Sequence, residues 1–152
     1  PGLLLIAMEM VYYIGLPVVA AIVLFFGIHY WMARKRAELR ESLQQDLAMT
    51  PGNMLIPPQK ASFRGATERF GKIKNDGAAF LTSEMLVFRS LIGKTVIKLE
   101  KQEIRGHRED VWFLTARHGN KKHLILQLDD GREVGFFVAD NEQWKSALNK
   151  II

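Results

Sequence analysis

The stretch that decides the fold of this chain is MVYYIGLPVVAAIVLFFGIHYWMA, residues 10–33. It carries no charge except on the titratable His29. A bilayer core of about 30 Å is crossed by about 20 apolar residues in a helix. Apolar side chains occur on every side of this helix, with no polar stripe. The stretch therefore predicts a membrane span over residues 10–33, within an N-terminal anchor that covers residues 1–33.

The residues at the two ends of the span indicate its orientation. Aromatic side chains favour the membrane–water interfaces, and they mark both ends here: Tyr12, Tyr13, Tyr30 and Trp31. Arg34-Lys35-Arg36 follows the span directly, whereas nothing before the span is basic. Because positive residues are enriched on the cytoplasmic side, we expect the N-terminus outside and the residues after Ala33 inside. The pattern predicts a single-pass protein of a bacterial inner membrane.

Two residues within the span have consequences of their own. Pro17 has no amide hydrogen, so it should kink the helix or loosen one backbone hydrogen bond. His29 lies near the cytoplasmic end, and the sequence leaves three interpretations of it open. The first is an axial ligand to a haem or pigment, and the second is a hydrogen-bonding group for a neighbouring helix. The third is an aromatic side chain that reaches the membrane interface.

A charged helix and a linker are predicted to follow the span. The juxtamembrane helix should cover residues 34–49, where Leu39, Leu43 and Leu47 repeat every four residues. This narrow apolar stripe is expected to pack on a partner or on the following domain. A Thr-Pro-Gly stop and a later Pro-Pro pair then predict a linker over residues 50–64.

The juxtamembrane helix also carries a basic cluster. Its members are Arg34, Lys35, Arg36 and Arg40. Such a cluster attracts anionic headgroups by about 1 kcal/mol per charge. The alternative is that these residues only mark the orientation of the anchor.

Residues 65–152 are predicted to form a domain of short strands with one final helix. Runs rich in β-branched and aromatic residues alternate with turns that contain Gly, Asp or Asn. The predicted strands are residues 69–74, 78–82, 85–90, 95–100, 111–117, 123–128 and 133–138. Tight turns are expected at residues 75–77, 118–120 and 129–131, and a helix capped by Asp140 is expected to run to Ile152. The predicted class is mainly β with α: a seven-stranded antiparallel barrel or sandwich capped by a C-terminal helix.

Three motifs suggest a family for this domain: AFLTSEMLVFR at residues 79–89, DGRE at residues 130–133 leading into FFV, and NEQW at residues 141–144. With these motifs, residues 65–152 resemble the pleckstrin-homology (PH) superfold and, within it, the GRAM and bacterial PH-like families. The resemblance implies binding and scaffolding, on lipid headgroups in some members and on protein surfaces in many others.

The same resemblance points to basic residues on the first two strands and on the loop between them. The matching positions here are Arg69, Lys72 and Lys74. We expect the tight turn at residues 75–77 to be that loop, and it is too short to wrap a polyphosphate. Only weak, salt-sensitive contacts with anionic lipid are therefore predicted.

The chemistry that the chain lacks narrows its function further. It has no cysteine, which excludes disulfides, thiolate metal ligands and a Cys nucleophile. It has no phosphate-binding loop, nucleophile elbow or dinucleotide fingerprint. His107, His118 and His123 lack metal-ligand spacing, and Asp129-Asp130 is explained by a turn. The net charge of +5 comes from dispersed basic residues interrupted by acids, which argues against nucleic acid as a partner. We expect no enzymatic activity, no cofactor and no metal.

The sequence is best interpreted as a non-enzymatic, membrane-anchored interaction or scaffold module. Its expected role is that of an accessory or stabilising subunit of a larger integral-membrane complex, of respiratory or photosynthetic type by analogy. Its expected partners are subunits of that complex and membrane lipids, including anionic headgroups. Two alternatives remain: an anionic-lipid sensor that uses Arg34, Lys35 and Arg36 with Lys72 and Lys74, and a pigment- or haem-binding anchor that uses His29.

Overall fold

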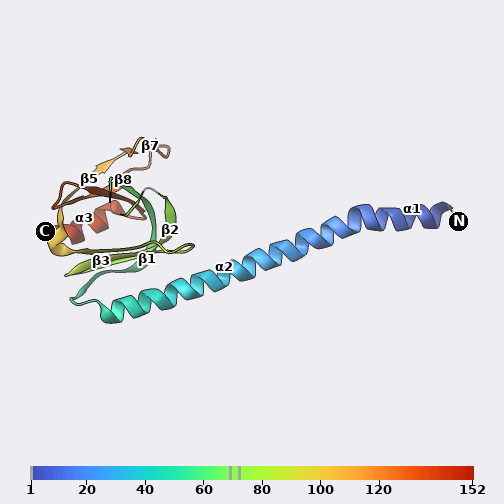
Figure 1. Cartoon of the computed structure of the whole chain (residues 1–152), viewed down its shortest axis with the longest axis horizontal. Coiled ribbons are helices and arrows are strands. Elements are labelled where there is room, and N and C mark those ends of the chain that lie inside the picture. The colour runs from blue at the N-terminus through green and yellow to red at the C-terminus, as the bar shows by residue number, and fades with distance from the viewer. Residues whose placement is uncertain (1, 69, 72) are drawn as a thin grey trace. The chain divides into compact units, whose positions relative to one another are not determined.

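The computed structural model describes residues 2–68, 70, 71 and 73–152. The chain divides into two compact units, Pro1–Ala37 and Glu38–Ile152. The first unit is helical. The second combines the end of the long helix with a curled antiparallel sheet and a final helix (Figure 1).

The N-terminal helix is interrupted by one widened turn. α1 covers Gly2–Met10, a π-helical turn (η1) covers Val11–Gly15, and α2 covers Leu16–Met49. Pro17 has no amide hydrogen to donate, and its ring crowds the carbonyl of Tyr13 one turn earlier. The widened turn lies directly before this proline and accommodates the missing hydrogen bond.

This is the one helix in the described part of the chain that is long and apolar enough to cross a membrane, judged by length and composition. An 18-residue stretch of it has a mean hydropathy of 2.3, and no part of that stretch is buried within the protein. The apolar surface that the sequence predicts on every side of the helix is therefore uncovered in the structure.

The sheet of the second unit has a long central strand. The strand bounds are β1 Met54–Ala66, β2 Asn75–Thr82, β3 Met85–Ser90, β4 Val96–Glu100, β5 Ile104–Asp110, β6 Trp112–Phe113, β7 Ala116–Arg117, β8 His123–Leu128 and β9 Glu133–Val138. The main sheet has seven antiparallel strands in the order β4-β3-β2-β1-β9-β8-β5, and β6 and β7 form a separate hairpin. Because β1 pairs with β2 on one edge and with β9 on the other, it joins the two halves of the sheet.

The final helix, α3 (Asn141–Asn149), packs against the core that the curled sheet encloses (Figure 1). Trp144 and Leu148 on α3 are at most 1% exposed. The Asp140 carboxylate accepts hydrogen bonds from the backbone N–H groups of Glu142 and Gln143, which confirms the predicted N-cap. The curled seven-stranded sheet with its terminal helix confirms the predicted fold class and fits a PH-like fold.

The predicted linker is wrong over most of its length, because residues 54–64 belong to β1. Pro57 and Pro58 cannot donate hydrogen bonds to a ladder, which places proline at strand edges or bulges. The two prolines lie both at a bulge and at an edge of the sheet. The pairing of β1 with β2 shifts register between Ile56 and Gln59, and β9 pairs only with the later part of β1.

The predicted strand at 69–74 and turn at 75–77 are also corrected. Arg69 and Lys72 lie outside the described residues, and their described neighbours between β1 and β2 are not in a strand. Asn75, Asp76 and Gly77 form the beginning of β2. A Cβ on Gly77 would collide with the carbonyl oxygen of Arg89 on β3, so this glycine allows close approach of two strands. The connection between β1 and β2 is residues 67–74, which is longer than the tight turn that the sequence predicts.

The last corrections concern β5 and its neighbour. β5 was not predicted, because its sequence IRGHRED is charged and lacks apolar alternation. Residues 111–117, predicted as one strand, form the β6–β7 hairpin. Its central residues Leu114 and Thr115 adopt φ values of 47° and 62°. Such a two-residue turn usually contains Asn or Gly, so the sequence carried no turn signal here.

Replacing Gly77 with Ala should destabilise the sheet. We expect the free energy of unfolding to fall by about 1–3 kcal/mol, the usual cost of overpacking, because the added methyl group meets backbone atoms of Arg89. Urea unfolding of the full chain in mild detergent would measure the loss. Gly106→Ala on β5 is the matched control, since its Cβ meets only the end of the Gln127 side chain. Equal stability of the two variants would contradict this interpretation.

Candidate interaction surfaces

The last turns of α2 pack on the outer face of β2 and β3. Side chains alternate between the two faces of a strand, and here the face away from the core is apolar as well. Leu43, Phe80 and Val87 form a second buried cluster in which each side chain is at most 4% exposed. The partly buried side chains that complete it are Leu39, Leu47, Ala78 and Met85. We call this contact the helix dock. The leucine stripe therefore packs on the following domain, one of its two expected positions.

An ion-pair cluster lies beside the helix dock. Asp46 on α2 is 5% exposed and accepts hydrogen bonds from Arg89 of β3, through Nε and, at 3.0 Å, through Nη2. Lys98 Nζ on β4 lies 3.5 Å from the same carboxylate. Burial alone would raise the pKa of Asp46, but the hydrogen bond and charge of Arg89, with the charge of Lys98, hold this pKa below its usual value. The ionised carboxylate thus fixes the position of this part of α2 on the sheet.

The chain that leaves α2 is tied to the turn between β2 and β3. Thr82 Oγ1 donates a hydrogen bond to the carbonyl oxygen of Pro51 at 3.0 Å. The Asn53 N–H donates to Ser83 Oγ at 2.9 Å, and the Ser83 N–H donates to the Asn53 carbonyl at 2.8 Å. The outer face of β2 and β3 is therefore covered by the chain itself and is not the free surface of this domain.

The basic residues predicted for lipid or partner contact lie in both units. Arg34-Lys35-Arg36 belongs to the first unit, and its two arginines are exposed. Arg40 is exposed on the part of α2 that belongs to the second unit. Lys74 is exposed just before β2, whereas Lys72 lies outside the described residues.

The aromatic residues predicted at the membrane interfaces are all exposed: Tyr12 and Tyr13 in η1, and Tyr30 and Trp31 in α2. His29 is exposed as well, and its ring lies edge-on to that of Phe25, with the centroids 4.3 Å apart. This arrangement offers one imidazole beside an aromatic neighbour. Each of the three interpretations of His29 therefore stays a prediction.

The β6–β7 hairpin covers the outer face of the other half of the sheet. The Phe113 ring lies on the backbone of Gly135 in β9, where a Cβ would collide with it. Trp112 is 54% exposed, and the guanidinium carbon of Arg117 lies 5.9 Å from its ring centroid. The hairpin is thus held by one buried ring and presents a tryptophan and a cation to its surroundings.

Next to the hairpin, basic side chains gather round Phe137 of β9. Arg64 Cζ and Lys121 Nζ each lie 4.6 Å from the centroid of this ring, within the range of a cation–π contact. The His123 ring stacks on Phe137, with the centroids 4.3 Å apart and an interplanar angle of 28°. We call Arg64, Lys74, Lys121, His123 and Phe137 the hairpin site; Lys74 is included because the next residue, Asn75, pairs with Phe63, the residue before Arg64.

His123 is buried at 1% exposure, yet only one of its ring nitrogens has a partner among the described residues. Nδ1 lies 3.1 Å from the carbonyl oxygen of Asp110, which can only accept, so Nδ1 carries the hydrogen. Nε2 has no hydrogen-bond partner in the described part of the chain. Burial lowers the pKa of His123, and the positive charges of Arg64 and Lys74 lower it further, against the opposing effect of the Asp110 carbonyl.

The lowered pKa of His123 predicts that stability falls on mild acidification. Below the ordinary histidine value of about 6.5 the unfolded chain binds the proton first, so the free energy of unfolding decreases as pH falls. We expect urea unfolding of the full chain in mild detergent to show this loss between about pH 7.5 and about pH 5.5. His123→Gln should reduce the loss, whereas His118→Gln, which changes an exposed ring, should keep it. An identical pH dependence in both variants would contradict the assignment to His123.

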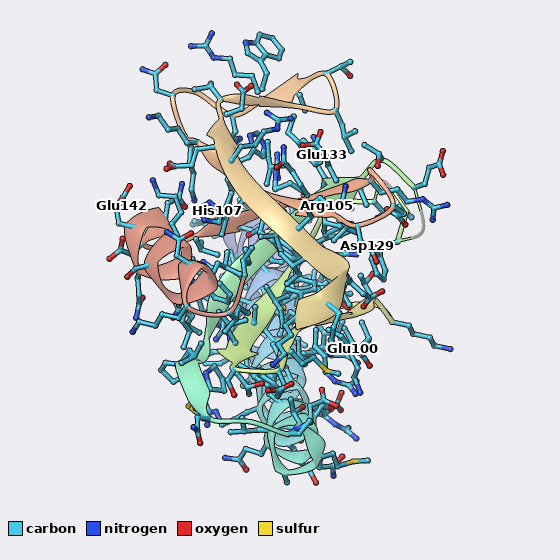
Figure 2. The ribbon with its side chains drawn as sticks, turned by 90° about the vertical axis from the view of Figure 1, so that its left-hand side faces the viewer. Glu100, Arg105, His107, Asp129, Glu133 and Glu142 are labelled. Carbon is cyan, nitrogen blue, oxygen red and sulfur yellow. The ribbon has the colours of Figure 1, made fainter. Side chains whose placement is uncertain are left out.

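Other charged groups of the second unit pair with one another. Arg108 on β5 donates to Glu133 on β9 at 2.7 Å and 3.1 Å. His107 Nε2 lies 2.7 Å from Asn149 Oδ1, and Figure 2 shows His107 on the side of β5 that faces α3. Asp130 accepts a backbone hydrogen bond at 2.9 Å within its own turn. Within residues 2–68, 70, 71 and 73–152, no three His, Cys, Asp or Glu side chains are placed to hold a metal ion.

Arg64 and Phe137 are the site residues that the sequence did not reveal. Arg64 fell at the end of the predicted linker, so it had no assigned face. In β1 it lies at a register shift against β9, between Phe63 and Gly65. Its guanidinium lies over the ring of Phe137, which does not belong to the main core cluster of the described residues. The sequence does contain one indication of a basic surface at this place: residues 111–122 contain Arg117, Lys121 and Lys122 but no acidic residue.

Comparisons with known proteins show a shared fold. No family model matches the chain, and no curated protein matches it. The C-terminal domain of an unknown protein from Leishmania infantum is similar in structure, with a TM-score of 0.50 and 16% identity, over 70% of this chain and 88% of that one. A structure of Vav1 inhibited by an allosteric inhibitor gives a TM-score of 0.49 at 16% identity, over 80% of this chain. Autoinhibited Vav1 gives 0.42 at 15% identity, again over 80%. This chain covers 35% and 24% of those two Vav1 chains. At these identities the similarity to the Leishmania domain is one of fold alone.

Proposed function

We propose that this chain is a non-enzymatic interaction module, anchored in a bacterial inner membrane by one helix, with a cytoplasmic domain of the GRAM or bacterial PH-like kind. The observation that carries the proposal is the uncovered apolar helix, with a mean hydropathy of 2.3 over 18 residues and none of them buried. Arg34-Lys35-Arg36 at its end supports an orientation with the N-terminus outside.

The proposed role is that of an accessory or stabilising subunit of a larger integral-membrane complex. The helix dock supports this role, because residues 39–47 of α2 pack on the sheet and so belong to the folded domain itself. The PH-like superfold, which the sequence resembles, is used for binding and scaffolding, so this part of the argument is by analogy.

Photo-crosslinking along the helix tests whether it has a protein partner. A photoreactive phenylalanine analogue would replace one residue at a time over residues 18–26, which are all exposed. A neighbouring helix should give adducts at positions three or four apart, because these share one face, and none on the opposite face. The unreactive face serves as the internal control. Adducts with no protein at any position would contradict the proposed role.

The orientation can be tested cleanly because the chain has no cysteine. Single cysteines placed at Gly2 and at Lys94, both exposed, provide one site in each unit. We expect a membrane-impermeant maleimide to label Gly2→Cys in intact cells whose outer membrane has been opened, and Lys94→Cys only after lysis. The reverse pattern would contradict the proposed topology.

An anionic-lipid sensor is the second candidate, favoured by the exposure of Arg34, Arg36 and Arg40 on α2. Full-length protein in nanodiscs of neutral or phosphatidylserine-containing lipid would test it through amide hydrogen exchange of residues 34–40. A sensor should show slower exchange with phosphatidylserine at low salt, and this difference should disappear at high salt. Identical exchange in both lipids at low salt would exclude this candidate.

A further inference from the structure

The hairpin site gathers positive charge that the described residues do not balance. Arg64 and Lys121 meet at the same Phe137 ring, each 4.6 Å from its centroid. Among the described residues, no ion pair involves Arg64, Lys74 or Lys121. Like charges that converge without a counter-charge raise the energy of the folded protein, so an anion bound between them would be stabilising.

Buried polar atoms at this site also lack partners. Arg64 Nε and His123 Nε2 are both buried without a hydrogen bond in the described part of the chain. Unpartnered polar atoms of this kind are rare in proteins, and each costs free energy. His123 is 1% exposed and its Nδ1–H donates to the Asp110 carbonyl oxygen, so Nε2 of the neutral ring carries a lone pair. Nε2 can donate a hydrogen bond to an anion only when it takes up a proton, whereas Arg64 Nε is a donor at all times.

The acidic side chains closest in sequence to the residues of the hairpin site already have partners. The Asp110 carboxylate accepts from Arg108 at 3.2 Å and from the Trp112 N–H at 2.9 Å. The following segment, residues 111–122, has no acid of its own. Asp76, two residues after Lys74, accepts a hydrogen bond from Ser62 at 2.6 Å, and Glu68, four residues after Arg64, lies 3.3 Å from Arg132. These acids therefore have partners other than Arg64, Lys74 and Lys121.

We propose that the hairpin site binds a phosphate monoester group between Arg64, Lys74 and Lys121, with His123 buried at the base of the site. Three cations match a dianion better than the single charge of a carboxylate or a phosphodiester. A phosphate monoester is close to a dianion at neutral pH. Guanidinium and ammonium groups are the usual partners of phosphate, the first through paired N–H groups and the second as a point charge. This proposal does not depend on the existence of a membrane complex.

The same phosphate group can belong to a lipid headgroup or to a soluble molecule, and the experiment separates the two sources. Full-length protein with isotope-labelled histidine would be placed in phosphatidylcholine nanodiscs and observed through the imidazole resonances of His123, assigned with His123→Gln. One arm adds inorganic phosphate at constant ionic strength. The other exchanges part of the lipid for phosphatidic acid, a phosphate monoester lipid, or for phosphatidylserine at equal total charge.

A saturable shift of the His123 resonances is the expected result in at least one arm. A shift with phosphatidic acid alone identifies a lipid source, and a shift with inorganic phosphate identifies a soluble one. Lys121→Gln and Lys74→Gln change exposed side chains and should keep the fold, and each should weaken binding by about fivefold, as expected for a partly exposed charge pair. Lys94→Gln, an exposed cation in the turn between β3 and β4, is the matched control and should bind as the wild type does.

Three results would overturn the proposal. The first is the absence of any shift in both arms. The second is a shift with phosphatidylserine equal to that with phosphatidic acid, which would indicate a general attraction to anionic lipid. The third is equal binding by Lys121→Gln and Lys94→Gln, which would place the anion elsewhere.

Discussion

Trp144→Ala should cost about 3–5 kcal/mol of the free energy of unfolding, the range measured for large aromatic side chains removed from a core. Trp144 is 1% exposed and belongs to the cluster that joins α3 to both halves of the sheet. Its removal would leave a cavity between α3 and the sheet, lined by Leu86, Leu124 and Phe136 among others. Urea unfolding of the full chain in mild detergent, followed by the circular dichroism of the sheet, would measure the loss.

Two further variants make this prediction specific. Trp112→Ala makes the same chemical change at a residue that is 54% exposed, and it should cost less than about 1 kcal/mol. Trp144→Phe should cost far less than Trp144→Ala, because the buried indole N–H has no hydrogen-bond partner to lose among the described residues. Similar stabilities for Trp144→Ala and Trp112→Ala would show that α3 does not close the core.

Leu43→Ala should lower the free energy of opening the helix dock by about 2–3 kcal/mol, near the low end of the range for a buried leucine. Leu43 is 4% exposed between Phe80 and Val87, which belong to neighbouring strands. The change removes apolar contacts on one side of the sheet and leaves the core on the other side intact. We therefore expect local opening of residues 38–53 before the sheet unfolds.

Limited trypsin digestion would detect this opening through cleavage after Arg40. A loss of about 2 kcal/mol should speed cleavage roughly thirtyfold when opening is fast and reversible. Met49→Ala, on the same helix but 83% exposed, is the matched control and should be cleaved at the wild-type rate. If Leu43→Ala is cleaved no faster than the control, the helix dock does not hold this segment.

Much of the fold followed from local pattern. The strands at residues 85–90, 123–128 and 133–138 have the predicted bounds, because each is a short run rich in apolar side chains with a turn signal beside it. The Asp140 N-cap could also be predicted from the sequence, because an N-cap depends on hydrogen bonds to the next few residues. The apolar helix was evident from composition alone.

The errors came from features that depend on distant residues. Gly77 looked like a turn because Asn-Asp-Gly is a turn sequence, but the backbone of Arg89 on the adjacent strand requires the glycine. The proline pair looked like a linker, and its place in β1 depends on a register shift against β2. The hairpin site combines Arg64 of β1, Lys121 of a turn and Phe137 of β9, which only the pairing of β1 with β9 brings together.

The size of the native assembly tests the central claim most directly. The full-length chain, expressed at its natural level with a small tag, would be extracted from membranes with a mild detergent. Size-exclusion chromatography with light scattering would then give its protein mass. We predict a mass well above that of one copy of the protein, with the same integral-membrane proteins co-purifying in constant ratio. A mass equal to that of one copy, with no co-purifying membrane protein, would contradict the proposal that it is a subunit of a larger complex.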